Sequence, residues 1–72
     1  MVDAHEVDLT ELEFEQLRNS SYIIMQTGSI EPQDYILFRQ NDSGLFMMTQ
    51  VVQLITNEGL KDGYSLITLN KL

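Results

Sequence analysis

The alternation of apolar and polar residues predicts one short helix near the start of the chain. The run Thr10-Glu11-Leu12-Glu13 has the form of a capping box, in which the threonine hydroxyl and the glutamate side chain each accept the other residue's backbone amide. Leu9 and Phe14 flank this run with the spacing of a hydrophobic staple. We therefore expect a helix from about residue 10 to residue 19. Its buried side is expected to comprise Leu12, Phe14 and Leu17.

Five further segments have the pattern of strands. Apolar, β-branched and alternating residues occur at 5–9, 21–27, 34–40, 45–56 and 64–69. The turn residues Asn41-Asp42-Ser43-Gly44 predict a hairpin between the third and fourth of these segments. The fourth exceeds the usual strand length of about five or six residues, so we expect a bulge or bend near Gln50. A final loop is expected from 57 to 63, and most strands are expected to join in sequence order.

Alternation along 21–27 divides the side chains of this strand between two faces. Tyr22, Ile24 and Gln26 share one face, and Ile23 and Met25 share the other. A groove on the first face would offer an aromatic ring, an apolar wall and a neutral amide. Such a groove suits a stacked base read at its edge, or an apolar side chain of another protein, but it does not hold phosphate strongly.

Length and composition limit the chain to one small domain spanning residues 1–72. The sequence has 72 residues and no cysteine, and no His/Cys cluster has metal-ligand spacing, so no metal or other cofactor is expected. One helix and about five strands predict an α+β fold, a small mixed β-barrel or curled sheet with the helix closing one end.

Acidic residues dominate the charge of the chain. Four Lys/Arg against eleven Asp/Glu give a net charge of −7, and the N-terminal acids are most simply a solvated helix face. This balance disfavours non-specific binding to a nucleic-acid backbone, which requires cations to neutralise phosphates. Residues 1–6 lack the features of a signal peptide, and no apolar run reaches the ~20 residues of a membrane span. A cytoplasmic protein without membrane contact is expected.

Nucleophilic catalysis would require a base beside a hydroxyl or thiol, and His5 is the only histidine. The one arrangement to consider is His5 with Glu6, oriented against Ser20 or Ser21. A lone histidine is more often structural, so the sequence predicts a protein that is not an enzyme.

The run Gly59-Leu60-Lys61-Asp62-Gly63-Tyr64 is the most distinctive motif. Lys61 is either a simple turn residue or a cation that reaches over a ligand cleft. Tyr64 either lies half-buried at the start of its strand or forms a cleft wall. This motif, together with the order of elements from 5–9 onward, resembles the small bacterial and phage ASCH-like domains. Those domains belong to the PUA superfamily of RNA-binding β-barrels, so the resemblance implies a PUA-like barrel.

The resemblance also implies where a ligand would bind. In the family a Gly-x-Lys-x-x-Glu-x-Arg type motif after the first helix lines the cleft. Here Asn19 lies near the family's glycine, Ser20 or Ser21 near its lysine, Ile24 near its glutamate and Gln26 near its arginine. Some members hydrolyse acylated nucleosides with a lysine, a threonine and a glutamate, and an isoleucine can neither move a proton nor orient water.

The sequence therefore predicts a non-enzymatic binding domain that recognises a base, a nucleoside-like ligand or a small RNA element. The expected cleft residues are Tyr22, Ile24, Gln26, Lys61 and Tyr64. The alternative is a protein-interaction module that uses the apolar cleft or a sheet edge, either as a homodimer or with another partner. Residual amidohydrolase activity is a third hypothesis, for which we expect no turnover.

Overall fold

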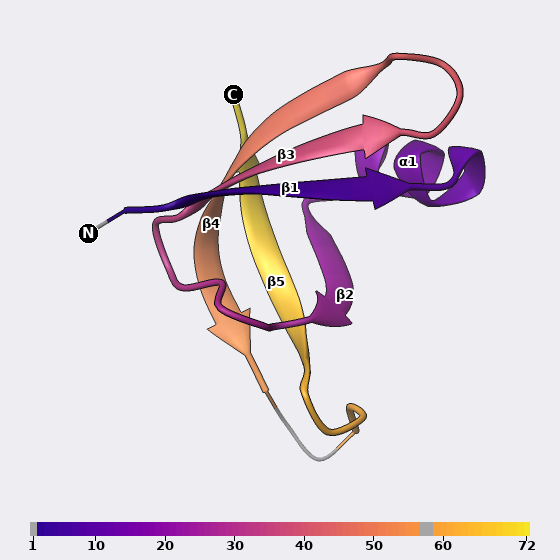
Figure 1. Ribbon diagram of the computed structural model, residues 1–72. Helices are drawn as coiled ribbons and strands as arrows, with labels where there is room; N and C mark the ends of the chain where they lie inside the picture. The colour runs from indigo at the N-terminus through magenta and orange to yellow at the C-terminus, as the bar shows by residue number, and fades with distance from the viewer. Residues whose placement is uncertain (1, 57–58) are drawn as a thin grey trace.

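The computed structural model describes residues 2–56 and 59–72 and contains the helix and all five strands that the sequence predicts (Figure 1). The predicted loop 57–63 lies partly outside these residues, because positions 57 and 58 are not described. In chain order the elements are β1 (Ala4–Leu9), α1 (Glu11–Arg18), β2 (Tyr22–Gln26), β3 (Tyr35–Gln40), β4 (Phe46–Ile55) and β5 (Tyr64–Lys71).

The strands form one sheet in the order β1-β3-β4-β5-β2. β3, β4 and β5 are antiparallel neighbours, β2 pairs antiparallel with β5, and β1 pairs parallel with β3. The expectation that most strands join in sequence order is wrong for β1 and β2, which occupy opposite edges of the sheet. The reason is the connection through α1, which carries the chain away from β1 before β3 returns to pair with it. The result is a half-barrel with two free edges.

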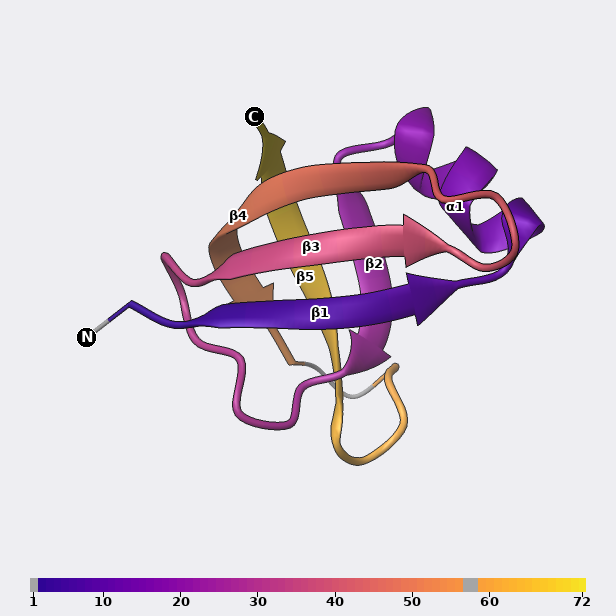
Figure 2. The ribbon, with the colours of Figure 1, turned by 45° about the horizontal axis from the view of Figure 1, so that its top comes forward.

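β4 bends and belongs to both halves of the sheet. Its first residues pair with β3, and residues from Thr49 onward pair with β5 (Figure 2). The register with β5 shifts between Val51 and Gln53, which confirms the bulge expected near Gln50. A bulge increases the local twist of a strand, so β1 and β3 come to lie across β5 and β2 with the core between them.

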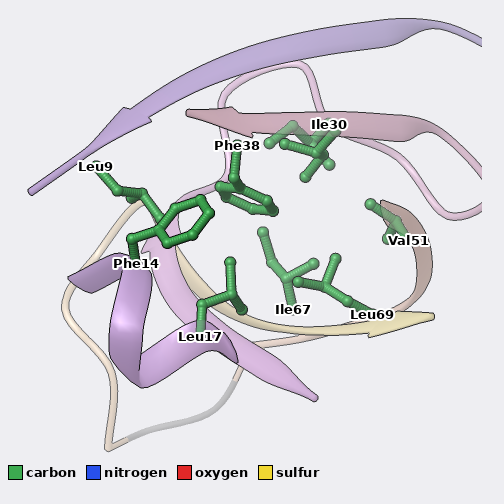
Figure 3. Packing of buried hydrophobic residues seen from close by; sticks show 9 residues of the cluster. Leu9, Phe14, Leu17, Ile30, Phe38, Val51, Ile67 and Leu69 are labelled. Atoms are coloured by element: carbon green, nitrogen blue, oxygen red, sulfur yellow. The ribbon is translucent and has the colours of Figure 1, made fainter. Parts of the chain in front are cut away.

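The core lies between the crossed strands and α1 (Figure 3). Phe14 and Leu17 of the helix are each 2% exposed, but Leu12 is 68% exposed, so its predicted burial is wrong. Positions three apart share one side of a helix, whereas position 12 lies on a different side from position 14. The buried apolar residues are Leu9, Phe14, Leu17, Ile30, Ile36, Phe38, Val51, Ile67 and Leu69.

The capping box at the start of α1 is formed as predicted. The Glu13 amide donates to Thr10 Oγ1 at 3.2 Å, and the Thr10 amide donates to Glu13 Oε1 at 2.9 Å. We expect Thr10→Ala to lower the free energy of unfolding by about 1 kcal/mol, because one helix donor loses its acceptor. Urea unfolding followed by circular dichroism measures the loss. The control Thr10→Ser keeps the hydroxyl and should differ little from the parent; equal losses in both variants would contradict this role.

A candidate ligand cleft at the open edge of the half-barrel

A cleft of about 810 Å³ lies where the edge strands β1 and β2 approach each other beside α1. Figure 2 shows α1 beside the end of β1 and the start of β2. Its apolar floor includes Val7, Ile23 and Met25, which pack against the core. The cleft exists because the sheet does not close between β1 and β2. Its lining residues are Val7, Asp8, Leu9, Glu13, Gln16, Leu17, Ser20, Tyr22, Ile23, Ile24, Met25, Gln26 and Tyr64.

Four of the five predicted site residues line this one cleft. Tyr22 and Ile24 are each 49% exposed, and Gln26 is also exposed at the end of β2. Gln26 is the register partner of Tyr64 on β5, so the amide and the half-buried ring lie on adjacent strands. The alternation along β2 thus places the side chains of Tyr22, Ile24 and Gln26 on its exposed face. The antiparallel pairing of β2 with β5 brings Tyr64 next to Gln26.

Lys61 is placed differently from the other four. Within residues 2–56 and 59–72, the cleft lining does not include it. Its Nζ instead lies 5.8 Å from the centroid of the Tyr64 ring, at cation–π distance. Gly63 between them has φ +83°, a left-handed conformation that favours glycine and lets the chain turn into β5. Lys61 therefore lies next to the cleft, because it contacts Tyr64, which lines it.

The charged residues in the cleft lining are acids. Asp8 lines it from β1 and Glu13 lines it from α1, and the lining has no Lys or Arg in the part of the chain that the structure describes. Asp8 Oδ1 also lies 3.4 Å from Arg39 Nε, but that arginine is outside the lining. The cleft therefore favours neutral or cationic groups and opposes phosphate.

The four basic side chains lie at other contacts. Arg18 and Arg39 form ion pairs with glutamates at 3.3 and 3.2 Å, both on the exposed surface. Lys71 Nζ donates to the backbone carbonyl of Arg18 at 2.8 Å, and Lys61 lies over the tyrosine ring. The sequence has only these four Lys and Arg residues. None of them offers the cluster of cations that a nucleic-acid backbone requires.

A buried carboxylate that the sequence analysis missed lies next to the start of β1. Asp34 is 1% exposed. Its carboxylate accepts hydrogen bonds from His5 Nε2 at 2.8 Å and from the backbone amides of Asp3 and Glu31 at 3.0 Å each. The bond from His5, followed by the amide of Asp3, lowers the pKa of Asp34 from 3.8 to about 2. The only sequence signal was a carboxylate at the first position of the expected strand 34–40, which the structure places directly before β3. Its partner became recognisable only from the parallel pairing of β1 and β3.

In the hypothesis of His5 with Glu6 oriented against Ser20 or Ser21, the structure gives His5 and Glu6 different partners. His5 bonds Asp34, whereas Glu6 lies 3.2 Å from Arg39 on the exposed surface. Neighbouring residues of a strand point to opposite faces, so His5 and Glu6 cannot act on one group. The Ser20 hydroxyl donates to two backbone carbonyls at the junction of α1 and β2. The His5–Asp34 hydrogen bond therefore links β1 to the residue that directly precedes β3, which is a structural role.

No protein-family model matches this chain, and no curated protein matches it either. In the described residues no helix has both the length and the apolar character needed to cross a membrane. Across the same residues, no three or more His, Cys, Asp or Glu side chains group in a way that would hold a metal.

Proposed function

We propose that the protein is a non-enzymatic binding domain that recognises a nucleobase, as a free nucleoside or as an exposed base of an RNA. The resemblance to ASCH-like domains of the PUA superfamily implies this class of ligand. The observation that supports it best is that Tyr22, Ile24, Gln26 and Tyr64 all line one open cleft, from the adjacent strands β2 and β5. The sequence predicts these four residues, together with Lys61, as the residues of a ligand cleft.

The chemistry of the cleft suits the base rather than the phosphate. Tyrosine rings are stacking platforms for bases, and a glutamine amide offers both a donor and an acceptor to a base edge. Asp8 and Glu13 add acceptors for an exocyclic amino group. The same acids repel phosphate, so an RNA would bind through a splayed base whose phosphates remain outside the cleft.

Titration followed by NMR tests this function. Cytidine and adenosine are expected to shift the backbone amide signals of Tyr22, Gln26 and Tyr64, and the corresponding nucleoside monophosphates should bind more weakly. Tyr22→Ala should weaken nucleoside binding roughly tenfold, because one base–aromatic stack contributes about 1–3 kcal/mol.

Tyr35 supplies a matched control for this experiment. It is a tyrosine of similar exposure, 36%, on the outer face of β3 and outside the cleft lining. Tyr35→Ala should leave nucleoside binding unchanged. Absence of shifts at the cleft residues, or equal effects of the two alanine variants, would refute nucleobase recognition here.

A second candidate function is protein interaction, as the sequence analysis also allowed. β2 is a sheet edge that borders the cleft, and apolar side chains are exposed elsewhere on the outer surface. Phe46 is 66% exposed and Met48 is 40% exposed on β4; Leu72 is 68% exposed, and its amide donates to the Met48 carbonyl at 3.1 Å. Exposed apolar surface of this kind is typical of interaction sites.

A further inference from the structure

The free edge of β2 presents unpaired backbone groups to the cleft. At one end of the β2–β5 ladder the Leu69 amide donates to the Ser21 carbonyl at 2.8 Å, and at the other end the Thr27 amide donates to the Gly63 carbonyl at 2.9 Å. In an antiparallel pair, hydrogen-bonded positions alternate along the strand. Every second residue between Ser21 and Thr27 therefore bonds to β5, and the residues between them direct their amides and carbonyls to the other edge.

The outward-directed backbone groups belong to Tyr22, Ile24 and Gln26. The Tyr22 carbonyl accepts the Ser20 hydroxyl at 3.2 Å, which satisfies one of them. β2 is the last strand in the sheet order, so no strand of the described chain pairs with this edge. The amides of Ile24 and Gln26 are thus available donors on the cleft side.

β2 lacks three of the common features that protect an edge strand from pairing, namely charged residues, proline and a bulge. Its five residues, Tyr-Ile-Ile-Met-Gln, include no charge and no proline, and its register with β5 is uninterrupted. The other edge differs, because the charged residues Glu6 and Asp8 alternate along β1, and charged side chains are a common protection of an edge strand. Of the two free edges, β2 is the one that carries no charged side chain.

The cleft determines which side chains an added strand would carry. Side chains of such a strand alternate between the two faces of the sheet. One set would contact the apolar floor formed by Ile23, Met25 and Val7, and the other set would point away from that floor; the charged residues of the cleft lining are Asp8 and Glu13. Apolar residues suit the first set, and Lys or Arg suit the second.

We propose that the β2 edge binds an extended segment of a partner protein in which basic and apolar residues alternate, added antiparallel to β2 as a sixth strand. This inference rests on the second candidate function, protein interaction, and not on nucleobase recognition. The net charge of −7 favours a basic partner and opposes a second copy of the chain. Strand addition supplies affinity through the backbone, and the cleft supplies specificity through the side chains.

Hydrogen exchange with synthetic peptides tests the proposal directly. The probe is a seven-residue peptide of alternating Lys and Val, capped at both ends. At saturation we expect exchange of the Ile24 and Gln26 amides to slow roughly tenfold or more, because they gain acceptors, whereas the Ile23 and Met25 amides are already bonded to β5 and should change little. Higher ionic strength should weaken binding.

Two control peptides separate backbone pairing from simple charge attraction. A peptide of alternating Glu and Val should not bind, and a Lys/Val peptide with a central proline should bind much more weakly. Equal binding by either control would overturn the proposal. Binding that shifts signals without slowing exchange at Ile24 and Gln26 would overturn it as well.

Variants of the protein complete the test. Ile24→Pro removes one backbone donor from the free edge of β2, and an edge strand tolerates proline at such a position. This variant should not bind the peptide, whereas Ile24→Val should bind it like the parent. Asp8→Asn combined with Glu13→Gln keeps both shapes and should weaken binding several-fold. If the parent chain instead sediments as a dimer and Ile24→Pro dissociates it, the edge binds a second copy and the proposal of a basic partner is wrong. Nucleoside titrations are read independently, so either function can fail alone.

Discussion

Replacing Phe38 with alanine is expected to lower the free energy of unfolding by about 3–5 kcal/mol. Phe38 is fully buried on β3, and Figure 3 shows its ring next to the Phe14 ring of the helix and near Ile67 of β5. Removing the ring leaves a cavity where the helix meets the crossed strands. A chain of 72 residues has a total stability of roughly 4–11 kcal/mol, so this one change removes a large part of it.

Phe46 provides the matched control, since it is the same residue type on the next strand but 66% exposed. Phe46→Ala should change stability by less than about 0.5 kcal/mol, as expected for a surface position. Urea unfolding of both variants and the parent measures the difference. Similar losses in the two variants would mean that the core is not centred on Phe38.

Asp34→Asn is expected to cause the second largest loss of stability. The carboxylate accepts three donors, from the His5 ring and the amides of Asp3 and Glu31. An asparagine of the same shape would present an amide group to at least one of these donors, which then has no acceptor. We expect a clear fall in the urea midpoint, greater than for Asp62→Asn, which changes an exposed carboxylate in the loop before β5. Equal effects at the two positions would contradict this role of Asp34.

The same residue predicts a dependence of stability on pH. The pKa of Asp34 is about 2 in the folded protein, below its ordinary value of 3.8. The ionised carboxylate therefore stabilises the folded state fully above pH 3.8, and this contribution is lost as the pH falls from 3.8 through about 2. In Asp34→Asn the part of the acid-induced loss that comes from this carboxylate should disappear. A parent-like fall in the variant would assign the acid sensitivity to other groups.

Much of the candidate site was predictable because it depends on local pattern. Alternation along β2 is a property of any extended chain, so the outward placement of Tyr22, Ile24 and Gln26 follows from the residues alone. The capping box is similarly local, because its partners are three residues apart. Leu12 shows where local reasoning failed: with eight residues, α1 offers the sheet only one narrow side.

Other parts of the site depend on contacts between distant segments. His5 and Asp34 are 29 residues apart and meet only because β1 pairs in parallel with β3. The cleft exists because β1 and β2 end at opposite edges of one sheet. Its acidic lining combines Asp8 of β1 with Glu13 of α1. The net charge of the sequence did not reveal that these two acids would line the same cleft.

The sequence by itself determined the elements of this protein: one capped helix, five strands, the bulge in β4 and the outward face of β2. These features depend on residue type and on sequence spacings of a few positions, and neither depends on how distant segments of the chain pack together. The tertiary structure alone decided the order of the strands, the open edge, the buried Asp34 and the unpaired backbone of β2. Strand order is settled by which pairing buries the most apolar surface at the lowest loop cost, and that balance belongs to the whole chain.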